Sequence, residues 1–395
     1  MQRRQFIGGT FAATAATALY GVTPALAADE LIVGYVMAKS GPFSSTGLSS
    51  EVAVDLAVQE INAAGGVSGK KLRIIKFDTA GQPEQAVLGI RRLATDDKAL
   101  GIIGPFLSSE CRVGFPIGDR LGISMMSSAS SAPGLTGTFK FAFRDTMDEE
   151  TKINRLLRYM KDKGLLGKSA SIAYATDDFV SKSVGTDSFP KAFKLANLPV
   201  QGSVNFPFAA FDLSPQVSQI LANPTDIVGL ASPPESAVKF VREMRRQGHK
   251  GRVIGGSIFV TPEWPSRVGE AGDGTLATVT FFSGRDEART KKFVQDYLAL
   301  AKERKLPEVL PPSQFDSASY DVVYIYAEAM RRAKVTGDVG KLAEERTAIR
   351  DELTKLKDFP GIEGSLTMGP DRDMIKSVYI IEARGGEWKL VDIAR

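Results

Sequence analysis

The chain has 395 residues, a formal net charge of +4 and a single cysteine, Cys111. This length allows two ordinary domains. Basic and acidic residues are mixed along the chain, which argues against a nucleic-acid surface, and one cysteine excludes an intrachain disulfide and a cysteine-based metal site.

The first 27 residues have the composition of an export signal. Arg3 and Arg4 precede a weakly apolar stretch rich in alanine and threonine, and an A-x-A pattern at residues 25–27 is typical of a cleavage site. Paired arginines before so mild an apolar region favour the twin-arginine route, with an ordinary Sec signal as the alternative. No cysteine lies at the cleavage site, so a lipid anchor is not indicated, and no later apolar run is long enough to span a bilayer. We expect residues 1–27 to be removed and the protein to reside in the periplasm.

From residue 31 onward, apolar β-branched runs alternate with amphipathic segments. We expect strands at 31–36, 72–77, 99–103 and 123–126, and helices at 49–63, 84–94 and 108–121. The pattern begins again after residue 148, with strands at 169–174, 200–204, 227–230 and 253–255 and helices at 149–163, 184–196, 214–221 and 235–247. Helices at 286–304, 317–333 and 339–356 and short strands at 364–368, 377–383 and 388–391 complete the chain. This order predicts the α/β class, with two doubly wound, Rossmann-like lobes.

Motifs of catalysis and metal binding are missing or incomplete. The segment at residues 65–70 lacks the first glycine and the final Ser or Thr of a phosphate loop, so we interpret it as a helix-ending turn. The single histidine, His249, falls at a predicted helix C-terminus, where we expect a surface position. Asp371 and Asp373 begin like a calcium loop without its later ligands, and we interpret them as turn residues. We interpret Cys111 as an unreactive helix residue, and we expect no enzyme activity, no cofactor and no metal.

Three serine-rich loops follow predicted strands, at residues 40–47, 104–109 and 127–133. Carboxyl ends of strands are the positions where open α/β sheets bind ligands. The first two loops run into predicted helix N-termini, whose unpaired N–H groups and partial positive charge suit a carboxylate. Serine is also a common cap and turn residue, so one such loop indicates little. Three of them in one half of the chain favour a binding site.

Several of these segments match one family in the expected order. The segment Ile61-Asn62-Ala63-Ala64-Gly65-Gly66, with Ser40-Gly41-Pro42-Phe43, Ile103-Gly104-Pro105 and residues 132–136, resembles the leucine/isoleucine/valine-binding protein family of type I periplasmic receptors. The resemblance covers nearly all of the mature chain. It implies two lobes joined by a three-crossover hinge, which close on a ligand. The N-terminal lobe would comprise residues 28–146 with 281–360, and the C-terminal lobe residues 147–280 with 361–395.

The resemblance also implies a function. Such a protein is the substrate-binding protein of an ABC importer of the branched-chain amino acid type, which captures a small amino acid or organic acid for a membrane permease. It would be a monomer without a nucleic-acid partner. A ligand-sensing receptor of the same fold, working with a separate signalling partner, is the alternative.

The family pattern places ligand-binding positions on this sequence. The ligand carboxylate would contact Ser108, Ala129 and Ser131, with Thr46 beside the ligand. An aromatic position of the second lobe falls on Phe179, and a second one falls near Ser232-Pro233, where there is no ring. The acidic residue that pairs with the ligand ammonium is replaced by Ser257.

The missing acid changes the expected ligand, because a buried ammonium without a carboxylate partner is costly. We hypothesise that carboxylate recognition is kept and ammonium recognition is weakened or lost. An aliphatic acid, an aromatic acid and an amide then remain open, and Asp177 or Asp178 would restore amino-acid binding by replacing the missing acid. An apolar wall would come from four rings, those of Phe43, Phe106, Phe179 and Phe259.

Overall fold

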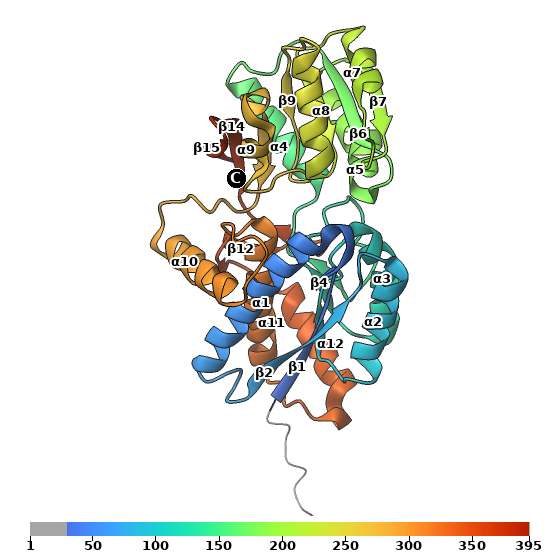
Figure 1. Ribbon diagram of the computed structural model, residues 1–395. Coiled ribbons are helices and arrows are strands. Elements are labelled where there is room, and N and C mark those ends of the chain that lie inside the picture. The colour runs from blue at the N-terminus through green and yellow to red at the C-terminus, as the bar shows by residue number, and fades with distance from the viewer. Residues whose placement is uncertain (1–29, 395) are drawn as a thin grey trace, which may run out of the picture.

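The computed structural model describes residues 30–394 and contains two α/β lobes, one above the other in Figure 1. The expected export signal lies outside the described residues. The first sheet has five parallel strands in the order β2-β1-β3-β4-β5. The second has the order β15-β14-β10-β9-β8-β6-β7, in which β14 alone runs antiparallel to its neighbours. No described helix is long and apolar enough to cross a membrane.

In the first lobe, helices cover both faces of the sheet. Alternate side chains of β1 enter different cores, with Val33 facing α1 and α11 and Val36 facing α2 and α3, as the two-residue period of a strand requires. The strands are β1 (Glu30–Met37), β2 (Lys71–Asp78), β3 (Gly101–Ile103), β4 (Met125–Ser127) and β5 (Ala142–Arg144). The helices are α1 (Ser44–Ala63), α2 (Pro83–Thr95), α3 (Ser108–Leu121), α10 (Ala288–Glu303), α11 (Gln314–Arg332) and α12 (Leu342–Thr354).

The second lobe repeats this layered arrangement. One core lies between the sheet and α4 and α6, and the other lies between the sheet and α7 and α8. The strands are β6 (Ala170–Ala175), β7 (Val200–Phe206), β8 (Ile227–Ala231), β9 (Arg252–Ile254), β10 (Leu276–Val279), β14 (Val378–Arg384) and β15 (Glu387–Ala394). The helices are α4 (Glu149–Asp162), α5 (Phe179–Ser183), α6 (Phe189–Leu195), α7 (Ser214–Leu221), α8 (Pro234–Arg246) and α9 (Trp264–Val268).

The late helices return to the first lobe. Phe293 of α10, Val322 of α11 and Ile349 of α12 are buried in the same core as β1. A small three-stranded sheet, β11 (Phe359–Gly361), β12 (Gly364–Met368) and β13 (Met374–Ile375), also packs side chains into this core. The exact residues at which the chain divides into lobes remain a prediction.

Buried charged and polar side chains connect the three segments of the chain that pass between the lobes. Asp145 lies on the first passage, Thr280 on the second and Lys376 on the third. The Lys376 ammonium lies 2.8 Å from the Asp145 carboxylate and also pairs with Glu363, and all three of these side chains are fully buried. The Thr280 hydroxyl donates to Glu363 at 3.1 Å. We call Asp145, Thr280, Glu363 and Lys376 the hinge cluster.

Two further charged contacts support this cluster. Asp373, interpreted from sequence as a turn residue, accepts a 2.7 Å hydrogen bond from Nε of buried Arg144. Asp321 of α11 accepts the backbone N–H groups of Ile362 and Glu363 at 2.7 and 3.1 Å. Burial, followed by the charges of Asp145 and Glu363, raises the pKa of Asp321 to about 8.

The surface position expected for His249 is wrong. The side chain is only 3% exposed, and its Nδ1 accepts the N–H of Gly251 at 2.8 Å. Burial, followed by the charge of Arg245, lowers the pKa of His249, so the ring is a neutral structural group and not a cation at a helix end. Cys111 is buried, and burial raises the pKa of its thiol to about 12, which fits the interpretation of an unreactive residue.

Candidate ligand-binding site

A cavity of about 110 Å³ lies between the lobes, and we call it the serine cavity. First-lobe residues line one side and the loops after β6, β8 and β9 line the other. The seven positions that the sequence assigns to ligand binding all line it: Thr46, Phe106, Ser108, Ala129, Ser131, Phe179 and Ser257. The structure therefore brings these positions together, while their contact with a ligand remains a prediction.

Five helices begin at this cavity. Its lining includes residues from the first turns of α1, α3, α5, α8 and α11, namely Thr46, Ser108, Phe179, Pro234 and Phe315. The first turn of a helix carries N–H groups without intrahelical partners and a partial positive charge. No N-cap side chain bonds the first turn of α1 or α3, although Glu110 of α3 accepts the N–H of its N-cap residue, Leu107. No lysine or arginine is among the described residues that line the cavity, so backbone N–H groups are its source of partial positive charge.

Ser108 connects two of the three serine loops, those at residues 104–109 and 127–133. Its hydroxyl oxygen accepts the N–H groups of Ser131 and Ala132, each at 3.3 Å, and lies 3.1 Å from the Ser130 hydroxyl. On the other side, the buried Glu110 carboxylate accepts the N–H of Leu107 at 3.0 Å, and burial raises the pKa of Glu110. These contacts hold the cavity wall in place without a ligand.

Ser257 has no hydrogen-bond donor left for a ligand. Its hydroxyl donates to Glu149 at 2.5 Å and accepts from Lys152 at 2.6 Å, and its N–H donates to Glu149 at 3.0 Å. Glu149 and Lys152 are themselves a buried ion pair at 2.6 Å. An acid thus lies close to the position where the family pattern requires one, but a lysine neutralises it. The sequence analysis missed this pair.

The two acids considered as replacements are also engaged. Asp178, the only ionisable residue among the described residues lining the serine cavity, caps α5 by accepting the N–H of Ser181 at 2.9 Å and its hydroxyl at 2.5 Å. Burial raises the pKa of Asp178. The Asp177 carboxylate accepts the N–H of Phe208 at 2.7 Å and does not line the cavity.

Apolar groups form most of the remaining wall. Phe43, Phe106 and Phe179 line the cavity as expected. Phe259 does not, because it is fully buried in the second-lobe core, 5.0 Å from the Trp264 ring. The structure adds Phe315, whose ring packs edge-on against Phe106 at 6.2 Å. The sequence analysis missed Phe315 because its helix is distant in sequence from the other lining residues and reaches the cavity only in the folded protein.

A comparison of the sequence with models of protein families agrees with this architecture. The sequence model described as periplasmic binding protein matches residues 30–387. The chain belongs to the periplasmic binding protein family.

Curated relatives of this periplasmic binding protein carry amino-acid-binding names. An amino acid binding protein of Pseudomonas aeruginosa is 26% identical over 276 residues, which cover 68% of this chain and 71% of the relative. The Leu/Ile/Val-binding protein BraC3 of Rhizobium johnstonii is 24% identical over 362 residues, covering 90% and 91%. The resemblance to the leucine/isoleucine/valine-binding family is confirmed.

Solved structures confirm the type I periplasmic binding protein fold. The branched-chain amino acid transporter substrate binding protein LivJ of Streptococcus pneumoniae, in complex with isoleucine, matches with a TM-score of 0.78 at 23% identity, covering 92% of this chain and 98% of that one. A solute binding protein of an R. palustris ABC transporter, in complex with benzoate, matches with a TM-score of 0.77 at 20% identity, covering 92% and 96%. Both of these neighbours are substrate- or solute-binding proteins.

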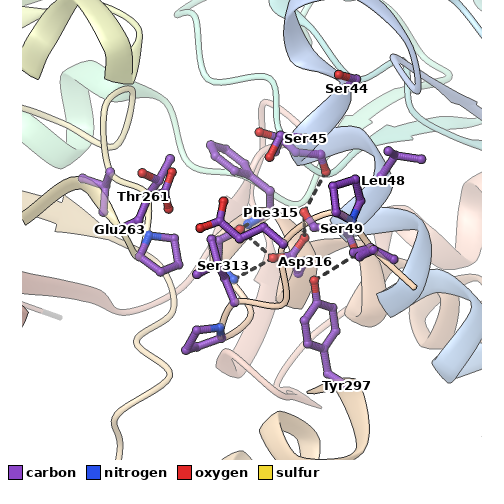
Figure 2. Close-up of a pocket in the computed structure, with 18 residues that line it drawn as sticks. Ser44, Ser45, Leu48, Ser49, Thr261, Glu263, Tyr297, Ser313, Phe315 and Asp316 are labelled. Carbon is purple, nitrogen blue, oxygen red and sulfur yellow. Dashed lines mark hydrogen bonds between the residues drawn. The ribbon is translucent and has the colours of Figure 1, made fainter. Parts of the chain in front are cut away.

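A second cavity of about 280 Å³ adjoins the serine cavity in this periplasmic binding protein, and Thr46, Thr261 and Phe315 line both (Figure 2). We call it the Glu263 cavity. Asp316 lies in its wall, buried, and accepts hydrogen bonds from the hydroxyls of Ser49 at 2.8 Å and Ser313 at 2.8 Å. Burial raises the pKa of Asp316.

Proposed function

We propose that this protein is the periplasmic substrate-binding component of an ABC importer. It captures a small carboxylate in the serine cavity, the lobes close around it by hinge motion, and a membrane permease receives the ligand. The family assignment and the transporter names of the structural neighbours support this proposal.

Five helix N-termini converge on one small cavity, and we base the proposed ligand class on this observation. Asp178 and Ser313 cap α5 and α11, so the first-turn N–H groups of α1 and α3 are the main groups that stabilise an anion and oppose a cation. Within the described lining, the one carboxylate belongs to Asp178 and is used as a helix cap. A ligand ammonium in the serine cavity would therefore have to share this one carboxylate with the cap, and burial raises the pKa of Asp178, which makes it a poor partner for a cation. We infer a ligand with a carboxylate and an apolar body, and without an α-ammonium group.

The fold alone does not decide between ligand classes, since neighbours at 23% and 20% identity hold isoleucine and benzoate. The lining decides. Four phenylalanine rings with Val180 and Ile258 give an apolar wall that fits a hydrocarbon or aromatic body.

Calorimetric titration of ligand-stripped, refolded mature protein tests the proposal with matched pairs. Leucine is compared with 4-methylpentanoate, which has the same side chain and carboxylate without the ammonium, and phenylalanine with 3-phenylpropanoate. We expect the acids to bind at least tenfold more tightly than the amino acids. Tighter binding of the amino acids would contradict the proposed ligand class and would leave the transport role standing. Failure of every acid and amino acid to bind would contradict the capture of a small carboxylate.

A further inference from the structure

We propose that the Glu263 cavity receives a protonated amine at the far end of the same ligand. The ligand would then carry its carboxylate in the serine cavity, an apolar spacer past Thr261 and Phe315, and a cationic nitrogen beside Glu263. This inference rests on the proposed function and names the ligand more closely.

Glu263 carries a carboxylate oxygen that lacks a partner. Its Oε2 atom is buried and has no hydrogen bond, and no lysine or arginine of residues 30–394 lies within ion-pair distance. The nearby Arg267 is instead held by two hydrogen bonds to Glu235, one of them 2.5 Å long. A buried carboxylate oxygen without a donor is costly, so the side chain gains free energy if it turns this oxygen toward a donor that a ligand brings into the cavity.

Thr261 provides a second unsatisfied group on the same loop. Its Oγ1 atom is buried without a hydrogen-bond partner, and the residue lines both cavities. The loop is held rigidly, because the Trp388 indole N–H donates to the Thr261 carbonyl oxygen at 2.9 Å and its ring stacks on Trp264 at 5.3 Å. Two polar groups are thus fixed at the passage from one cavity to the other.

The two cavities differ in their acids. Glu263, Glu308 and Asp316 line the Glu263 cavity, with no lysine or arginine among its described lining residues, whereas Asp178 is the one acid in the described lining of the serine cavity. Asp316 is satisfied by serine donors, and Glu308 is exposed to solvent. Glu263 is therefore the acid of this cavity that has a buried oxygen without a partner. Ser44 and Ser45 line the first-lobe side of this cavity (Figure 2). Such a pair of cavities suits a carboxylate and a cationic nitrogen held apart.

The test compares ligands that differ only at the far end. Straight-chain ω-amino acids of four to eight carbons are titrated by calorimetry beside alkanoates with one carbon more, so that a methyl group replaces each ammonium. The series covers a range of distances between the two charges. Each pair is measured on the wild-type protein, on Glu263→Gln and on Glu308→Gln. The last is a matched control, since it makes the same change at an exposed acid of the same cavity.

We expect at least one ω-amino acid to bind about tenfold to a hundredfold more tightly than its alkanoate, as a charged hydrogen bond in a protected site provides. Glu263→Gln should abolish this preference and Glu308→Gln should keep it. Alkanoates that bind as well as every ω-amino acid would overturn the inference and leave the proposed carboxylate site intact. An equal preference in Glu263→Gln would overturn it in the same way. Failure of both series to bind would overturn the carboxylate site together with the inference. The wild-type comparison needs no variant, so it remains decisive if Glu263→Gln unfolds.

Discussion

The ammonium of Lys152 lies 2.6 Å from the carboxylate of Glu149, and both groups hydrogen-bond to the hydroxyl of Ser257 on the cavity wall. The negative charge beside the site is therefore cancelled inside the protein. This relationship explains why Glu149, although it lies behind the cavity wall, does not offer a free negative charge to an ammonium group.

Removal of the lysine should be strongly destabilising. Lys152→Met leaves the buried Glu149 without a cation, and we expect the free energy of unfolding to fall by about 3–5 kcal/mol. Urea denaturation measures this loss. The double variant Glu149→Gln with Lys152→Met should recover most of it, because no uncompensated charge then remains. A double variant as unstable as the single one would mean that packing, and not charge, is responsible.

The close approach of Gly256 to the ion pair gives a second prediction. A Cβ atom at residue 256 would lie 1.5 Å from Glu149 Oε2, so Gly256→Ala must displace a buried carboxylate. We expect a loss of about 1–3 kcal/mol in unfolding free energy. Gly202→Ala is the control, since the nearest atom to its new Cβ would be 3.7 Å away, and we expect a change within about 0.5 kcal/mol. Equal effects of the two substitutions in thermal or urea unfolding would contradict this explanation.

The hydroxyl of Ser131 should contribute to carboxylate binding. Ser131 lines the serine cavity, and we expect Ser131→Ala to weaken the binding of the preferred acid about 3- to 10-fold, the effect of one hydrogen bond. Ser131→Thr keeps the hydroxyl and should keep most of the affinity. Calorimetry on both variants tests this prediction, and an alanine variant with wild-type affinity would remove Ser131 from the site.

The raised pKa of Asp321 predicts a pH dependence of stability. Its carboxyl has a pKa of about 8 in the folded protein, against about 4 in an unfolded chain, so the folded state binds the proton more tightly. The free energy of unfolding should therefore fall as the pH rises from about 4 to about 8. Asp321→Asn removes this titration and should flatten that slope in urea denaturation at a series of pH values. The exposed Asp358→Asn is the control, and a slope unchanged by Asp321→Asn would contradict the assignment.

Most of the fold could be predicted from the sequence, because each element is decided locally. The helix predicted at 108–121 is α3 with the same bounds, and the helix at 214–221 is α7. The helix predicted at 184–196 is instead α5 and α6 joined by a π-helical turn at Val184–Ser188, which the local pattern does not encode. The burial of His249 also depends on tertiary packing that no local pattern reports.

The candidate site could likewise be predicted only where the local sequence is distinctive. The serine loops could be found because each follows a strand and two of them start a helix. The partners of Ser257 could not, because Glu149 and Lys152 lie 108 and 105 residues earlier and look like the exposed start of an amphipathic helix. Phe315 and Glu263 were missed for a similar reason, since neither belongs to a loop with a distinctive composition.

The return of α10, α11 and α12 to the first lobe has a consequence for the order of synthesis. The five neighbouring parallel strands of the second sheet, β6 to β10, are complete once Val279 has been made. The core around β1 still lacks Phe293, Val322 and Ile349 at that point. During synthesis, the parallel strands of the second lobe can thus pair before the first lobe has received the residues from the last third of the chain that complete its core. The oldest part of the nascent polypeptide is among the last to acquire its finished interior.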